Sequence, residues 1–185
     1  MQGTVFTSFS DMVIEKMGMP VWNELLKKIK PNSEGIYTNG MQYENAEIMA
    51  YATELSIITQ VDAPTLIRKF GEYLFIDFYR NSPLKTSQID NLKDFLICVD
   101  SLIHKEVKRL YPNAYLPSFN YDEKPNGDLI MFYQSKRKLC HLCEGLIMGA
   151  AKHFQQSISI KHPECMHHGA ERCKLVICFE DLHER

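Results

Sequence analysis

The chain has 185 residues, a length at which we expect one domain, or one domain with two lobes, around a substantial core. Its composition is 45% hydrophobic and 24% charged, which excludes a disordered chain. The net charge is −2, which argues against nucleic acid as a partner. No apolar run reaches the ~18 residues of a membrane span, and no signal-peptide core forms before Asp11. We therefore expect a cytoplasmic protein that does not enter a membrane.

The first half of the sequence predicts helices. Ser10 and Asp11 can cap a helix that runs to about Met17. Apolar residues spaced by three and four predict the further helices, and prolines stand where a first helical turn tolerates them. These predicted helices cover residues 20–29, 45–60, 64–80 and 86–110.

The pattern changes after residue 113. Two extended segments, residues 115–121 and 128–133, flank a strong turn signal at residues 124–127. A helix over residues 137–154 and strands over residues 157–161 and 174–179 follow. This order predicts an α+β fold with a four-stranded antiparallel sheet and a crossing helix. We expect a single domain over residues 1–185, with a helical lobe (1–62) and an α+β lobe (63–185).

Three hydrogen-bond donors alternate at Tyr133, Ser135 and Arg137. In an extended backbone, residues two apart point to the same side, so the phenol, the hydroxyl and the guanidinium converge. Such a set suits one or two carboxylates, because arginine can bind a carboxylate with two parallel hydrogen bonds. The alternative is an exposed strand end with ordinary polar side chains.

His104 lies late in the predicted helix 86–110, beside the apolar stripe that includes Ile103 and Val107. One interpretation is a boundary histidine that interacts with the C-terminal dipole of the helix. The other is an axial metal ligand on a rigid helix, because a neutral imidazole suits iron and zinc.

Five of the six cysteines lie in the last 46 residues, close to several histidines. Without a secretion signal, this clustering indicates metal rather than disulfides. His162, Cys165 and Cys173 surround one polar loop, and either Cys140 or Cys143 can add a fourth ligand for structural zinc. The alternatives are free buried thiols with surface histidines, or thiolates that sense oxidation.

Taken together, these motifs resemble the haem–nitric oxide/oxygen-binding (H-NOX) family, the bacterial relatives of the soluble guanylate cyclase sensor domain. The resemblance is carried by residues 1–5, 101–104, 115–119 and 133–138. It implies that haem b binds between the two lobes, with His104 as the proximal ligand of the haem iron. It also implies that Tyr133, Ser135 and Arg137 bind the haem propionates and that Pro117 presses on the haem and bends it.

The resemblance also implies which gas is bound. Oxygen-binding members of the family carry a tyrosine at the position of Leu142, and a missing donor of ~1–3 kcal/mol weakens oxygen retention about ten- to hundredfold. We expect an apolar lining without donors, formed by Val5, Phe9, Leu74, Phe78, Leu142 and Leu146. The expected function is therefore a nitric oxide sensor that excludes oxygen.

Nitric oxide would weaken or break the bond between iron and His104 and free the helix that carries it. Because 185 residues leave no room for an output domain, we expect signalling in trans to a histidine kinase or a cyclic-di-GMP enzyme. If Leu142 faces the haem, Cys140 is rotated about 160° away from it. We therefore choose Cys140, His162, Cys165 and Cys173 as the zinc ligands.

Two other functions compete with this one. The C-terminal half also resembles zinc-bearing small-ligand domains of the vinyl reductase type, which would hold an organic effector without haem. An enzyme is the second alternative, but the sequence has no paired-carboxylate signature, nucleophile elbow or glycine-rich phosphate loop. We therefore expect a protein that is not an enzyme.

Overall fold

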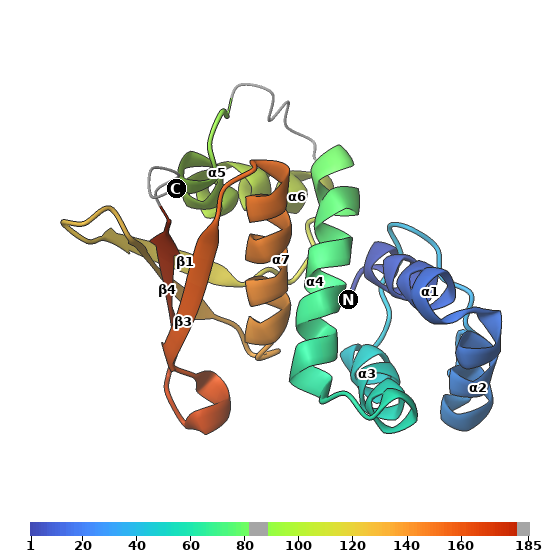
Figure 1. The fold of residues 1–185 in the computed structure, drawn as a ribbon. Helices are drawn as coiled ribbons and strands as arrows, with labels where there is room; N and C mark the ends of the chain where they lie inside the picture. Colours follow the sequence, from blue (N-terminus) through green and yellow to red (C-terminus); the bar gives the residue numbers. More distant parts are fainter. Residues whose placement is uncertain (82–88, 181–185) are drawn as a thin grey trace.

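The computed structural model describes residues 1–81 and 89–180. Its first four helices are α1 (Gly3–Met17), α2 (Met19–Ile29), α3 (Asn45–Thr59) and α4 (Ala63–Arg80). Their buried faces form one core, and its largest side chains are Phe6, Phe9, Trp22, Leu25, Tyr51, Leu55, Phe70 and Leu74. Figure 1 shows α1, α2 and α3 on one side of α4.

The start of α1 differs from the prediction. The helix begins at Gly3 rather than after Ser10, and no side chain caps it. Tertiary contacts hold its first turn instead, because Gly3 N donates to the carbonyl of Met41 at 2.8 Å. A Cβ at Gly3 would lie 2.1 Å from the carbonyl oxygen of Thr38, so only glycine fits this approach. Ser10 lies inside the helix, where its hydroxyl donates to the carbonyl of Thr7.

The predicted long helix is interrupted. Its residues 86–88 lie outside the described residues, and the helical structure described beyond them begins at Leu92, where Asn91 caps the first turn. Three helical segments then follow one another: α5 (Leu92–Cys98), the π-helix η2 (Val99–His104) and α6 (Lys105–Leu110). A π-helix widens the turn by one residue, and such turns are frequent at functional sites. His104 is the last residue of η2.

The C-terminal half forms the predicted antiparallel sheet, in the order β1-β2-β4-β3. Its strands are β1 (Ser118–Glu123), β2 (Leu129–Gln134), β3 (Ile158–Glu164) and β4 (Cys173–Phe179). Helix α7 (Cys140–His153) crosses one face of this sheet, and α4 runs beside α7 (Figure 1). The α+β fold, with its sheet and crossing helix, is confirmed.

Helices α4 and α7 pack closely against each other where each of them has a glycine. A Cβ at Gly145 of α7 would lie 2.0 Å from the carbonyl oxygen of Arg68, and one at Gly71 of α4 would lie 2.5 Å from that of Leu142.

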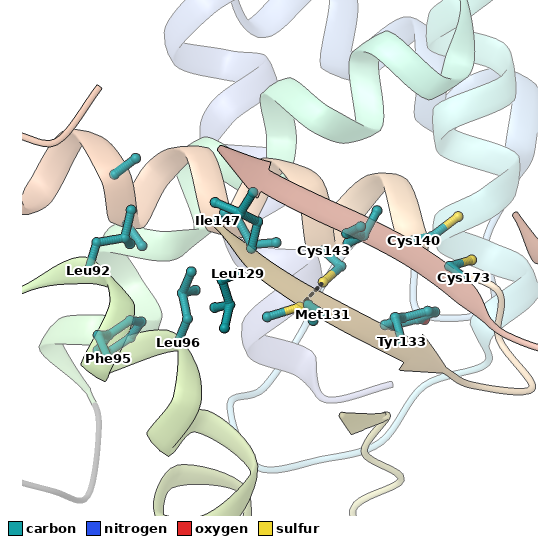
Figure 2. Packing of buried hydrophobic residues seen from close by; sticks show 14 of the residues in the cluster. Leu92, Phe95, Leu96, Leu129, Met131, Tyr133, Cys140, Cys143, Ile147 and Cys173 are labelled. Atoms are coloured by element: carbon teal, nitrogen blue, oxygen red, sulfur yellow. Dashed lines mark hydrogen bonds between the residues drawn. The ribbon is translucent and has the colours of Figure 1, made fainter. Parts of the chain in front are cut away.

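The second core lies between α7, α5 and the sheet, and it includes Phe75 of α4. Figure 2 shows this core, with Phe95 and Leu96 of α5 facing Leu129 and Ile147. Helix α4 therefore contributes to both cores.

None of the described helices is both long enough and apolar enough to cross a bilayer.

Candidate functional site

A cavity of about 380 Å³ lies between the first turn of α1, the α4–α7 pair, the α5–α6 segment and the sheet. This volume is within the range of small-molecule and cofactor sites. Most of its lining is apolar, and the apolar side chains include Phe75, Phe78, Leu96, Val99, Ile103, Phe119, Met131, Leu142 and Leu146. The cavity therefore suits a large apolar ligand with a few polar groups.

His104 lines this cavity and its side chain is only 17% exposed. The Nδ1 atom lies 3.1 Å from a carboxylate oxygen of Asp100, four residues earlier on the same helical segment. The ring stacks on Phe119, with 5.4 Å between the centroids. Burial lowers the pKa of His104, although the Asp100 carboxylate acts in the opposite direction. The neutral imidazole that results keeps its proton on Nδ1, so the lone pair of Nε2 can bind a metal.

The three alternating donors line the same cavity. Tyr133 is in β2, and Ser135 and Arg137 follow it in the connection to α7. The Tyr133 hydroxyl accepts from Leu139 N at 2.9 Å and the Ser135 hydroxyl accepts from Arg137 N at 3.2 Å, so neither contact uses the hydroxyl proton. Arg137 donates to the carbonyl of Tyr115 and lies 4.8 Å above its ring.

Partial burial lowers the pKa of Arg137, and a carboxylate partner would offset this effect. The set is therefore suited to carboxylates at the cavity edge.

Of the apolar residues expected along the cavity, Val5, Phe78, Leu142 and Leu146 line it, as does Pro117. Phe9 and Leu74 are not among its lining residues. Both are buried in the helical core, where the ring of Phe9 packs edge-on against Phe70 with 5.1 Å between centroids. Val5 lies four residues before Phe9 and on nearly the same face of α1, but about 6 Å farther along the helix axis, and it is Val5 that lines the cavity.

Several residues that line the cavity or contact its lining were not assigned a role from the sequence. Asp100, which contacts His104, could have been found, because it stands four residues before it on one helix face. Tyr115 and Phe119 stand in the segment 115–119 that carries the family resemblance, but only Pro117 of that segment was given a role. Two polar residues at the start of α1, Gln2 and Thr4, and Gln42 beyond it also line the cavity, and the Gln42 amide donates to the carbonyl of Asn113 at 3.0 Å.

A second cluster combines Cys140, His162, Cys165 and Cys173, whose ligand atoms all lie within 4.8 Å of one another. The Sγ atoms of Cys140 and Cys165 are 3.8 Å apart. Two sulfurs bound to one tetrahedral zinc at about 2.3 Å would also be about 3.8 Å apart. Burial and the neighbouring thiols raise the pKa of Cys140, and a bound cation would reverse this effect. The four donors therefore fit a closed zinc site.

Local structure brings these donors together. Between the pairs Lys161–Val176 and Glu164–Lys174, the edge strand β3 has one residue more than β4, which is a β-bulge. Pro163 lies in this bulge, where its missing N–H interrupts no ladder. Across the sheet, Met166 N donates to the Cys173 sulfur at 3.3 Å.

Cys143 is not part of this cluster. Figure 2 shows its sulfur directed at Met131 of β2, 4.0 Å away, while Cys140 and Cys173 lie farther along the sheet.

The comparisons with known proteins agree with this geometry. A family model described as Haem-NO-binding matches residues 2–162. The chain belongs to this family. The structure is similar to that of an H-NOX protein from S. oneidensis in the Fe(II)NO ligation state, with a TM-score of 0.91, 34% identity and coverage of 98% of this chain and 100% of that chain. An unliganded Fe(II) H-NOX protein from K. algicida gives a TM-score of 0.89 at 29% identity, and both chains are covered completely.

Among curated proteins, soluble guanylate cyclase gcy-34 of Caenorhabditis elegans is 28% identical over 159 residues, which are 82% of this chain. The match spans only 23% of that cyclase. Members of the H-NOX family are haem-binding gas-sensor domains and are not themselves catalytic. The cavity fits haem by its own chemistry, because it combines a neutral imidazole, an apolar lining and donors for two carboxylates.

Proposed function

We propose that this protein senses nitric oxide at ferrous haem, excludes oxygen and signals to a separate partner protein. The observation that supports this most directly is that one cavity is lined by His104, held by Asp100, and by the donors Tyr133, Ser135 and Arg137. His104 would bind the iron through Nε2. The tyrosine, serine and arginine would bind the propionates.

When bound, ferrous haem would supply an iron that takes a diatomic gas. The selectivity then depends on the surrounding side chains. Val5, Leu142 and Leu146 line the cavity and have no hydrogen-bond donor. A donor of ~1–3 kcal/mol retains oxygen about ten- to hundredfold longer, so these apolar side chains disfavour oxygen. Nitric oxide needs no such donor.

The signal would begin at His104. His104 would attach the haem iron to the segment that contains α5, η2 and α6, and haem would supply an iron whose hold on this segment depends on the bound gas. This segment has exposed apolar side chains, among them Ile97 at 40% and Leu102 at 49% exposure, which suits contact with a partner. The partner class that we propose is a histidine kinase or a cyclic-di-GMP enzyme.

The proposal has a second part, a structural zinc ion. Cys140, His162, Cys165 and Cys173 would hold it, because their ligand atoms match the spacing of a tetrahedral site. A closed site of this kind stabilises a fold rather than catalysing a reaction. It would tie the polar loop between β3 and β4 to the first turn of α7.

The visible spectrum of the ferrous protein tests the sensor. We expect a Soret band that shifts when nitric oxide is added and that does not change to a stable oxygen spectrum in air. A stable oxygen spectrum would contradict the selectivity and would point to Thr4 as a donor. A colourless protein from cells with ample haem precursor would contradict haem binding and favour an organic effector in the cavity.

His104→Ala serves as the matched variant in this experiment. It should lose haem, and added imidazole should restore the Soret band by replacing the missing ligand. A variant that keeps haem without imidazole would exclude His104 as the ligand.

A further inference from the structure

One buried carboxylate is not used by the function proposed so far. Glu144 lies on α7, and its side chain is only 7% exposed. Arg68 of α4 donates to one of its oxygens, and His141 Nδ1 lies 3.4 Å from the same oxygen. His162 Nδ1 lies 2.5 Å from the other oxygen. Glu144 therefore connects Arg68 of α4 to His162, the histidine of the cluster formed by Cys140, His162, Cys165 and Cys173 (the thiolate cluster).

The two nitrogens of His162 differ in their surroundings. Nδ1 faces the carboxylate of Glu144, so this nitrogen carries the proton and donates it. Nε2 is buried and has no hydrogen-bond partner among the described residues. Buried polar atoms are nearly always satisfied, so an unpartnered ring nitrogen calls for an explanation. Nε2 is also the nitrogen left to join the three sulfurs of the cluster.

We infer that Glu144 is the positioning residue for the metal ligand His162, and that Arg68 in turn holds Glu144 in place. The inference rests on the zinc site of the proposed function. A carboxylate that accepts from one imidazole nitrogen fixes the ring orientation and makes the other nitrogen a stronger ligand. Arg68 adds a fixed positive charge that keeps the buried carboxylate ionised.

The competing explanation is an ordinary ion pair that only holds α4 and α7 together. That role would make Glu144 important for stability but not for the affinity of the cluster for zinc. The two explanations therefore differ in metal binding, which can be measured separately from folding and from haem chemistry.

The experiment uses the full haem-loaded chain, dialysed to equilibrium against a zinc–chelator buffer under reducing conditions, with bound zinc measured by elemental analysis. We expect Glu144→Gln to bind zinc about 10- to 100-fold more weakly than the wild type. The control is Glu164→Gln, which removes a 53% exposed carboxylate two residues after His162 and should leave the affinity within about twofold.

A double-mutant cycle with His162→Ala makes the test specific. If Glu144 acts through His162, Glu144→Gln should cause almost no further loss in the His162→Ala background. An unchanged affinity in Glu144→Gln, or the same loss in both backgrounds, would overturn the inference.

A second variant and the zinc content of the wild type distinguish failure of the Glu144 role from failure of the zinc site. If Glu144→Gln does not fold, Arg68→Gln replaces it, because this partly exposed side chain is less critical for folding. It should lower the zinc affinity severalfold in the wild type and not in the His162→Ala background. If the wild type binds no zinc, the zinc site itself is rejected. If the wild type binds zinc, but Glu144→Gln and Arg68→Gln bind it equally tightly, only the role of Glu144 is rejected.

Discussion

Single residues decide the chemistry of the cavity. Leu142 lines it on the α7 side and offers no donor, and the selectivity that we propose depends on this property. We predict that Leu142→Tyr introduces a donor and gives an oxygen spectrum in air, with oxygen retained at least about tenfold longer than in the wild type. The spectrum of the ferrous protein and the rate of oxygen loss measure this.

Leu142→Phe is the matched control, because it adds the same ring without the hydroxyl. It should behave as the wild type does in air. Oxygen retention by both variants would mean that ring size, rather than hydrogen bonding, controls access to the cavity.

The grouping of the three donors follows from their close spacing rather than from alternation along a strand, because β2 ends at Gln134 and Arg137 lies in the turn before α7. Tyr133, Ser135 and Arg137 do line one cavity. Phe9 and Leu74 lie in the helical core, and the sequence could not place them there, because an apolar residue on a helix fits either a cavity lining or a core and only the neighbouring helices decide between them. Glu144 was missed for a related reason, since its partner Arg68 is 76 residues away and no local pattern links them.

At the scale of secondary-structure elements, two glycines determine how closely helices α4 and α7 pack. Gly71 and Gly145 let the two helix backbones touch, and a Cβ at Gly145 would lie 2.0 Å from a backbone oxygen. We predict that Gly145→Ala lowers the free energy of unfolding by about 3 kcal/mol, because backbone rather than a flexible side chain would have to move. Urea unfolding measures this.

Gly127→Ala is the comparison for this prediction. Gly127 has φ +87° at the β1–β2 turn, with no atom within 4 Å of an added Cβ. Its substitution should destabilise by only about 1 kcal/mol, through backbone conformation alone. Equal effects of the two variants would mean that the helix contact can relax.

Element boundaries were predicted well where a cap or proline marks them. Asp62 accepts from Thr65 N at 2.9 Å and caps α4, which begins at Ala63 where the sequence predicted a helix from residue 64. The start of α1 was wrong because contacts with residues 38–43, rather than a local cap, hold its first turn. The π-helix at residues 99–104 was also missed, since its apolar spacing resembles that of an ordinary helix.

The whole molecule combines two hydrophobic cores that share α4, and the thiolate cluster lies at one end of the second core. Three of its members, Cys140, Cys165 and Cys173, are buried. We predict that removing zinc with a chelator under reducing conditions destabilises the protein by about 4 kcal/mol when zinc had been present at about 1,000 times its Kd. Urea unfolding before and after zinc is restored measures the change.

Cys165→Ser should be insensitive to the chelator, whereas Cys143→Ser should respond as the wild type does, because Cys143 packs against Met131 instead. A wild type whose unfolding midpoint ignores both chelator and added zinc would contradict the structural role of the cluster.

Helix α7 belongs to both sites, because Leu142 and Leu146 line the cavity while Cys140 is a member of the Cys/His cluster and Glu144 contacts its histidine, His162. Equilibrium thermodynamics makes any communication along such a shared element symmetrical. If zinc in the Cys/His cluster changes the affinity for haem by some factor, haem in the cavity must change the affinity for zinc by the same factor. A favourable coupling would populate the doubly loaded protein more than two independent equilibria give, and an unfavourable coupling would populate it less.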